Sequence, residues 1–248
     1  MRRIYLLFLL ILLCHKQEDR LKVVVTTSLI QGIVEEIGKD KVEVSTLIPS
    51  GMCPGHFDIK PQDMKALSSA SLVLSQGWER IPKTQKIGIE GNWMIPDIHI
   101  KAVEKITEIL CRKDPENREG YRRNGEDYKK RVLALTHEIK KEAKRLKGIR
   151  VVSSQYQKDF LEWLGLDVVG VYARPEDLTP KTLKEIIDRA KREGVRLVVD
   201  NLQSGKDAGL PIAEEIGAKH ITLTNFPENS YIESLRENVE KLLCAIRQ

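Results

Sequence analysis

Short runs of β-branched residues alternate with amphipathic stretches in the first part of the chain. Residues 22–27 read KVVVTT, and the next stretch places apolar residues at helical spacing. Strands that alternate with helices predict a parallel sheet with crossover helices. The predicted strands are 22–27, 42–48 and 72–75, and the predicted helices are 29–37, 64–69 and 98–110.

A single apolar stripe follows this first region. Its members recur at steps of seven, four, three, four, four and three residues, which matches about 3.6 residues per turn. The spacing predicts one continuous helix of roughly seven or eight turns. The stripe consists of Tyr121, Tyr128, Val132, Leu135, Ile139, Ala143 and Leu146.

The alternation of strand and helix then starts again and continues to the end of the chain. The predicted strands are 150–153, 168–171, 196–200 and 220–223, and the predicted helices are 156–164, 180–193, 208–216 and 230–246. The pattern predicts an α/β fold of two lobes, each a small, mostly parallel sheet with flanking helices, joined by one long backbone helix. We divide the chain into an N-terminal segment (1–21), a first lobe (22–118), a linking helix (119–148) and a second lobe (149–248).

Two such lobes predict a ligand cleft between them. Open α/β sheets bind ligands beyond the carboxyl ends of their strands. The loops expected to converge on the cleft are 50–57, 91–96, 154–155, 200–203 and 224–229.

The N-terminus has the pattern of an export signal. Arg2 and Arg3 precede ten apolar residues, 4–13, and Cys14 follows them. The apolar run is too short to span a bilayer and has the length of a signal-peptide core. A Cys at this place resembles a prokaryotic lipidation site, although Leu13 stands where that pattern has a small residue. We expect export and a lipid anchor on Cys14, at the outer face of the cell membrane or in the periplasm.

The composition agrees with the predicted fold. The 248 residues are 41% hydrophobic and 31% charged, as expected of a folded domain. The net charge of +5 includes two N-terminal arginines, and no basic stripe carries interleaved aromatic residues, so we expect no nucleic-acid partner. Of the remaining cysteines, Cys111 and Cys244 fall in apolar helical patterns and are expected in the core, whereas Cys53 lies in a Gly/Pro loop.

Several motifs resemble the zinc/manganese solute-binding receptors of ATP-binding cassette importers. The loop 49–63 reads PSGMCPGHFDIKPQD, and Trp93 and Pro96 precede a helix that leads to Asp114-Pro-Glu-Asn117 and Tyr121. The last helix begins NSYIESL at residue 229. The resemblance covers about residues 22–246. It implies a monomeric receptor without enzyme activity that delivers a metal ion, of the zinc/manganese class, to a membrane permease.

The family's metal ligands are substituted at each matching position. The family's His, His, His and Asp fall on Gly55, Gly91, Gln155 and Asn229. A glycine offers no ligand and a neutral amide is a weak one. The remaining polar groups are Asn92, Asn201 and Gln203, and Trp93 offers a stacking surface.

Two interpretations of the bound species follow. In the first, the cleft accepts a metal chelate or a small polar organic solute through its amides. In the second, a divalent transition metal is kept by relocated ligands, with Cys53 and His56 in the first loop and Asp200 at a strand end. Asp58 and His99 are further candidates for that second set.

Two other classes of protein compete with a receptor. A Cys53–His56 nucleophile pair would indicate a hydrolase, but the sequence has no Gly-x-Ser-x-Gly elbow and no His-Glu-x-x-His motif. A surface adhesin or scaffold is the other alternative. An open cleft would favour the receptor, and a filled one the scaffold.

Overall fold

The computed structural model describes residues 20–247 and places a parallel sheet in each lobe. Among these residues, the first lobe contains a four-stranded sheet of order β2-β1-β3-β4. Its strands are β1 (Leu21–Val25), β2 (Val42–Thr46), β3 (Leu72–Ser75) and β4 (Gln85–Lys86), and its helices are α1 (Ser28–Gly38), α2 (Pro61–Ser69) and α3 (Pro96–Lys113).

Alternation along β1 explains how this sheet is covered. Val23 and Val25 point into the main core with α1 and α3, whereas Val24 points to the opposite face. On that face a smaller cluster includes Leu67 of α2. Successive strand residues face opposite sides, so one run of valines serves both layers.

The second lobe repeats this plan. Among the described residues, its four parallel strands have the order β6-β5-β7-β8. Val199 of β7 faces the main core, and Val198 faces a separate cluster formed with Ile186 and Ile212. The strands are β5 (Arg150–Ser154), β6 (Asp167–Tyr172), β7 (Leu197–Asn201) and β8 (Lys219–Leu223), and the helices are α5 (Lys158–Trp163), α6 (Pro180–Glu193), α7 (Leu202–Gly205), α8 (Leu210–Ile216) and α9 (Tyr231–Ile246).

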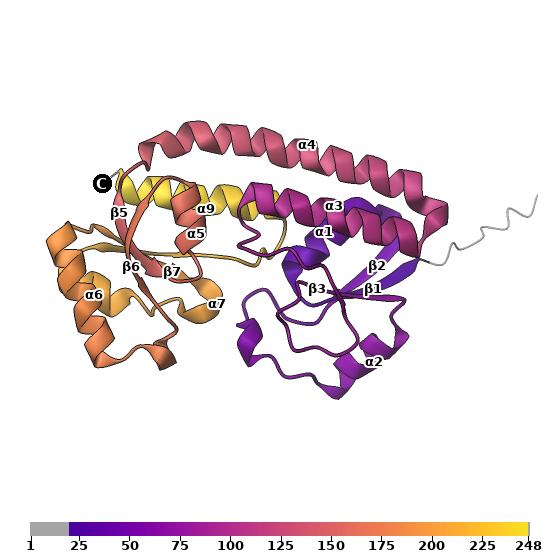
Figure 1. Cartoon of the computed structure of the whole chain (residues 1–248), viewed down its shortest axis with the longest axis horizontal. Coiled ribbons are helices and arrows are strands. Elements are labelled where there is room, and N and C mark those ends of the chain that lie inside the picture. Colours follow the sequence, from indigo (N-terminus) through magenta and orange to yellow (C-terminus); the bar gives the residue numbers. More distant parts are fainter. Residues whose placement is uncertain (1–19, 248) are drawn as a thin grey trace, which may run out of the picture.

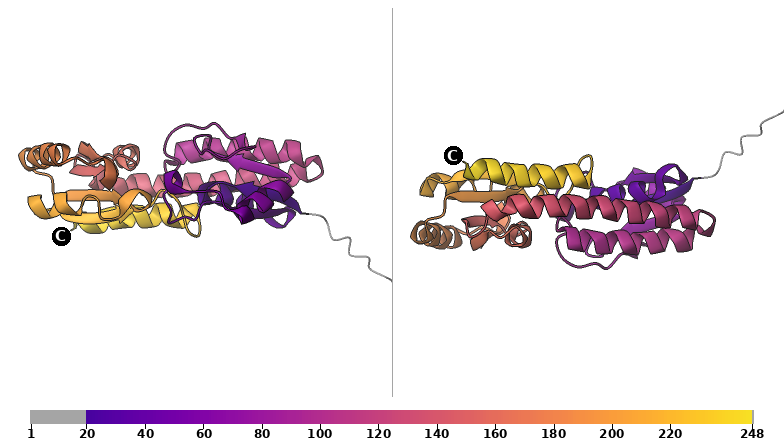
Figure 2. Two further views of the ribbon diagram at one scale, coloured as in Figure 1. Left: turned by 90° about the horizontal axis from the view of Figure 1, so that it is seen from below. Right: turned by 90° about the horizontal axis from the view of Figure 1, so that it is seen from above.

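One long helix, α4 (Arg118–Glu142), runs across both lobes and ends in a 3-10 turn, Ala143–Arg145 (Figure 1). All seven members of the predicted stripe are buried in the main core, which also contains Val23 of the first sheet and Val199 of the second. Figure 2 shows α4 alongside α3 of the first lobe and α9 of the second. A core shared in this way resists large movement of one lobe against the other.

The predicted fold class is confirmed, with local corrections. The helix predicted at 208–216 begins at Leu210, because Gly209 precedes it and a separate short helix, α7, comes first. The helix predicted from Tyr156 begins at Lys158, which leaves Tyr156 in a loop. Strand β4 was not predicted, because two polar residues carry no strand pattern.

Three further expectations concern the ends and the cysteines. Cys14 lies outside the described residues. Cys111 is buried as expected, but Cys244 is exposed near the end of α9, so its prediction as a core residue is wrong. Among residues 20–247, no helix has the length and apolar character needed to cross a membrane. The division at residues 118 and 148 stays a prediction.

Candidate solute-binding cleft

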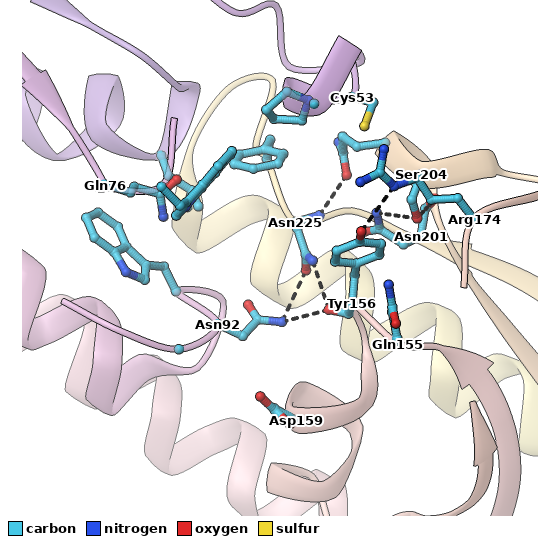
Figure 3. A pocket seen from close by; sticks show the side chains of 18 residues that line it. Cys53, Gln76, Asn92, Gln155, Tyr156, Asp159, Arg174, Asn201, Ser204 and Asn225 are labelled. Atoms are coloured by element: carbon cyan, nitrogen blue, oxygen red, sulfur yellow. Dashed lines mark hydrogen bonds between the residues drawn. The ribbon is translucent and has the colours of Figure 1, made fainter. Parts of the chain in front are cut away.

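A cleft of about 470 Å³ lies between the two lobes (Figure 3). Residues 53–55, 76 and 78 form part of its wall from the first lobe, and residues 155–156, 201 and 203–204 contribute from the second. These segments follow the carboxyl ends of strands, where open α/β sheets place their ligands. The cleft has the volume of a small-molecule site.

Most of the residues predicted for the cleft line it. Their contact with a ligand stays a prediction. The predicted residues in its wall are Cys53, Gly55, Gly91, Asn92, Trp93, Gln155, Asn201 and Gln203.

Gly55 and Gly91, which the sequence motifs predict to match two of the family's ligand positions, fit their surroundings closely. Gly91 has a φ of +98°, and an added Cβ would lie 2.7 Å from Cδ1 of Ile98. A side chain there would strain the backbone and displace Ile98. An added Cβ on Gly55 would lie 3.3 Å from Nη1 of Arg174. The guanidinium of Arg174 therefore lies beside Gly55, the residue that the sequence motif predicts to match the family's first His.

Trp93 belongs to the core more than to the cleft. Its side chain is 2% exposed, and its Nε1 donates a hydrogen bond to the carbonyl oxygen of Ile89 at 2.9 Å. Trp93 borders the cleft but exposes little of its ring. The predicted stacking surface is therefore wrong for this residue, because the loop turns its ring toward the first lobe's core.

Asn92 and Asn225 form a polar bridge between the lobes (Figure 3). Nδ2 of Asn92 donates to the carbonyl oxygen of Tyr156 at 3.1 Å and to Oδ1 of Asn225 at 3.3 Å. Nδ2 of Asn225 donates to the same carbonyl at 2.9 Å. Asn92 comes from the first lobe and the other two residues from the second, so these hydrogen bonds join the two lobes in the wall of the cleft.

Gln203 makes a second bridge. Its Nε2 donates to the carbonyl oxygen of Ser50 in the first lobe at 2.7 Å and to Oγ1 of Thr224 at 2.9 Å. Its Oε1 accepts from the backbone N–H of Asn225 at 3.2 Å. The amides of Asn92 and Gln203, which the sequence suggested would bind a solute, thus form hydrogen bonds with other residues of the chain. Gln155 differs, since its exposed side chain makes no hydrogen bond with any residue between 20 and 247 in this structure.

Asn229 does not line the cleft, so its predicted placement is wrong. It borders a separate pocket with residues of α1 and α4, including Glu35 and Arg131. The chain leaves the cleft after Asn225 and Phe226, which take the place expected for Asn229. The four residues from Asn225 to Asn229 can span about 13 Å, which is far enough for the loop to carry Asn229 out of the cleft and into the other pocket.

Asp200 also lies outside the cleft. Its side chain is fully buried and accepts hydrogen bonds from the Tyr172 hydroxyl at 2.6 Å and the Gly209 N–H at 3.0 Å. Nε2 of His220 lies 2.5 Å from Oδ2, the carboxylate oxygen that also accepts the hydrogen bond from Gly209. In β7 it shares a face with Val198, toward α6 and α8, whereas Asn201 faces the cleft. This alternation contradicts its prediction as a cleft ligand.

The other proposed metal ligands are also separated. Cys53 lines the cleft, whereas His56 is exposed, lines a different pocket with Asp58, and has Nε2 3.4 Å from Oε1 of Glu176. His99 is fully buried. Within residues 20–247, no three His, Cys, Asp or Glu side chains are grouped so that they could hold a metal ion. The structure does not assemble the relocated ligand set.

Sequence reasoning missed three residues that shape the cleft. Trp78 follows β3, Tyr156 follows β5 and Arg174 follows β6, and all three line the cavity. Trp78 and Arg174 come shortly after the ends of β3 and β6, so the rule that ligands lie beyond strand ends selects both residues. Tyr156 falls inside the predicted helix 156–164, so the same rule does not select it.

Buried hydrogen bonds hold the Trp78 loop in place. The Glu79 carboxylate accepts from the backbone N–H of Gln76 at 3.0 Å and of Gly77 at 2.8 Å, and also from the Thr26 hydroxyl. Trp78 itself is 54% exposed. The loop therefore presents a large aromatic surface to solvent at the cleft without being loosely held.

Arg174 lies in the part of the wall that the second lobe forms, and a hydrogen bond to Tyr156 positions it. Its Nε donates to the Tyr156 hydroxyl at 3.2 Å, and this hydrogen bond raises the pKa of the guanidinium. Nη1 lies 3.7 Å from Oε1 of Glu176. Arg174 thus remains a fixed positive charge in the wall of the cleft.

Two parallel-sheet lobes, a long helix that crosses both, and a cleft between strand-end loops define a two-lobed solute-binding protein. The family model described as zinc-uptake complex component A, periplasmic, matches residues 23–87 and 91–245. The chain belongs to this family.

Curated relatives span nearly the whole chain. The manganese ABC transporter substrate-binding lipoprotein PsaA of Streptococcus anginosus is 24% identical over 273 residues, covering 90% of this chain and 88% of that protein. The iron ABC transporter substrate-binding lipoprotein MtsA of Streptococcus pyogenes serotype M1 is 24% identical over 275 residues, covering 91% and 89%.

Solved structures agree on the fold. The crystal structure of ZnuA has a TM-score of 0.80 at 22% identity and covers 92% of this chain and 99% of its own. The binding protein FpvC of Pseudomonas aeruginosa, solved with Ni²⁺, has a TM-score of 0.79 at 23% identity, with 92% and 97% covered.

Proposed function

We propose that the chain is the extracytoplasmic solute-binding receptor of an ATP-binding cassette importer, and that it serves metal uptake. The observation that carries the proposal is the interlobe cleft, built from strand-end loops of both lobes in a member of this family. The relatives, named as manganese and iron ABC transporter substrate-binding lipoproteins, support a metal-containing cargo.

The receptor needs to capture and release its cargo without covalent chemistry. Helix α4 and the shared core favour small lobe movements over a wide hinge opening. The bridges made by Asn92 and Gln203 would open and close with cargo entry. The loaded receptor would then dock, as a monomer, on a membrane permease powered by an ATPase.

We place the receptor at the outer face of the membrane. Cys14 would carry the lipid anchor after export, as its position behind the apolar run suggests. The printed names of the relatives, which are lipoproteins, support this proposal.

The cleft also weighs against the rival classes. A scaffold would be expected to fill this space, whereas about 470 Å³ is open. A hydrolase would need His56 beside Cys53, but the two side chains line different pockets.

A metal-retention assay tests the proposal. Purified protein is mixed with Mn²⁺, Zn²⁺ or Fe³⁺, with and without citrate, passed through a gel-filtration column, and analysed for metal per chain. We expect about one metal per chain in at least one condition. Gln155→Trp, which fills the cleft at a side chain without a protein partner, should abolish retention, and Gln62→Trp on exposed α2 should not. Retention that survives Gln155→Trp would place the cargo outside the cleft.

A further inference from the structure

The size and chemistry of the cleft disagree with a bare cation. A cavity of about 470 Å³ would hold roughly fifteen waters at about 30 Å³ each. Asp159 is the carboxylate in its wall, and Cys53 is the thiol. A divalent ion needs several oxygen, nitrogen or sulfur ligands around it, which these two side chains cannot supply.

The side chain beside Gly55 is a positively charged arginine, whereas a metal-binding site provides neutral or negatively charged ligands. The Arg174 guanidinium contacts the space above Gly55, where the family has its first His. A fixed positive charge there repels a cation and attracts a carboxylate or another oxyanion. Glu176, which neighbours Arg174, does not line the cavity and is half exposed, so it neutralises Arg174 only in part.

The rest of the wall is largely apolar and aromatic. Leu29, Pro54, Trp78 and Phe226 come from four separate segments and line the same cavity. Trp78 is held by the Glu79 loop and remains 54% exposed, although burial of a Trp side chain is strongly favourable. Such a surface suits the face of a planar organic group.

The geometry therefore points to an organic anion with a planar or apolar body as the ligand of this cleft. Its carboxylate or other oxyanion binds Arg174, its body packs on Trp78, and its remaining polar groups reach Gln155. The same anion could enter alone or as the chelator of a metal. In the second case the metal is coordinated by the organic anion instead of by protein side chains.

This inference rests on the proposed function, because it assigns the cargo of the same cleft. It differs from that proposal in one testable respect. A receptor for a bare metal ion should bind metal without any organic anion and should tolerate the loss of Arg174.

Binding can be located with the protein's own cysteines. Cys53 lines the cleft, whereas Cys244 is exposed at the far end of α9. The purified protein is treated with iodoacetamide, and alkylation at each cysteine is followed by mass spectrometry. The probes are citrate and 2,3-dihydroxybenzoate, each alone and with Fe³⁺, and MnCl₂ and ZnCl₂ alone. We expect at least one anion to slow alkylation of Cys53 and to leave Cys244 unchanged.

Titration calorimetry with variants then tests the roles of the residues. Loss of a charge-assisted hydrogen bond predicts that Arg174→Gln weakens binding of the anion by about 10- to 100-fold. Arg192→Gln, at an exposed arginine near the end of α6, is the matched control and should bind as the wild type does. Trp78→Ala should weaken 2,3-dihydroxybenzoate by about 5- to 50-fold, and citrate by much less. Trp78→Ala therefore tests the inference independently if Arg174→Gln does not fold.

The anions alone, the anions with Fe³⁺ and the metal salts alone give different expected results. Protection of Cys53 by an anion alone supports a free organic anion and would contradict the metal uptake in the proposed function. Protection that requires Fe³⁺ supports a chelate and agrees with both proposals. Mn²⁺ or Zn²⁺ that binds at one per chain and protects Cys53 equally in Arg174→Gln would overturn this inference and leave the proposed function intact. If neither metal nor any anion binds the folded protein, both proposals are wrong.

Discussion

His99 makes the stability of this receptor dependent on pH. The side chain is fully buried, its ring stacks on Tyr231 with centroids 3.5 Å apart, and its Nε2 lies 3.0 Å from the Tyr128 hydroxyl. The three residues come from α3, α4 and α9, so they join the first lobe, the linking helix and the second lobe. A change of charge at His99 would therefore act where the lobes are held together.

Burial lowers the pKa of His99 to about 3. The unfolded chain takes up this proton near pH 6.5, but the folded chain does so only near pH 3. The contribution of the neutral imidazole to stability is therefore complete above pH 6.5 and is lost as the pH falls toward 3. The linkage relation gives a loss of about 2 kcal/mol at pH 5 and about 4 kcal/mol near pH 3.

Urea unfolding of the wild type and of His99→Phe at pH 7.5 and pH 5 measures this effect. The phenyl ring keeps the stacking but leaves the Tyr128 hydroxyl without its partner, so we expect a loss of about 1–3 kcal/mol at pH 7.5. The decrease in unfolding free energy between pH 7.5 and pH 5 should be about 2 kcal/mol smaller in this variant. His137→Gln, at an exposed position on α4, should keep the wild-type pH dependence. Equal pH dependence in wild type and His99→Phe would refute the reasoning.

Three further changes have expected results in the same unfolding assay. Gln203→Ala removes three neutral hydrogen bonds, at about 0.5–1.5 kcal/mol each, and should destabilise the protein by about 1.5–4.5 kcal/mol. Gly91→Ala should cost about 1–3 kcal/mol, because φ is +98° and the new Cβ meets Ile98. Asp200→Ala should cost about 3–5 kcal/mol, since it leaves buried donors, including the N–H of Gly209, without an acceptor.

Matched controls exist for each of these changes. Gln62→Ala on exposed α2 and Asp207→Ala in an exposed turn should each change stability by less than about 0.5 kcal/mol. Gly32→Ala on α1, where an added Cβ meets no atom within 4 Å, should stabilise the protein by about 0.5–1 kcal/mol, because Ala is the better residue in a helix interior. A Gln203→Ala protein as stable as its control would mean that the interlobe bridge contributes nothing. The same result for Gly91→Ala would show that the backbone relaxes there without strain.

The amino-acid sequence determined the layers of this fold. The valines of the first strand and the stripe from Tyr121 to Leu146 are local patterns, and each predicts an element whose faces can be read directly. The alternation of strands and helices likewise predicted two parallel sheets and a cleft at their strand ends. Family membership could be inferred because loop motifs such as 49–63 resemble those of the family, and the family model matches residues 23–87 and 91–245.

The composition of the cleft was decided by the tertiary structure. Asp200 and Asn201 are neighbours in sequence, yet strand alternation sends one into the core and the other into the cleft. Asn225 replaces Asn229 because the loop turns away between them, and Arg174 approaches Gly55 across more than a hundred residues of sequence. Local periodicity can indicate which face of an element is apolar. Which loops meet, and whether an amide faces a solute or the opposite lobe, depends on contacts between distant segments that only the folded chain brings together.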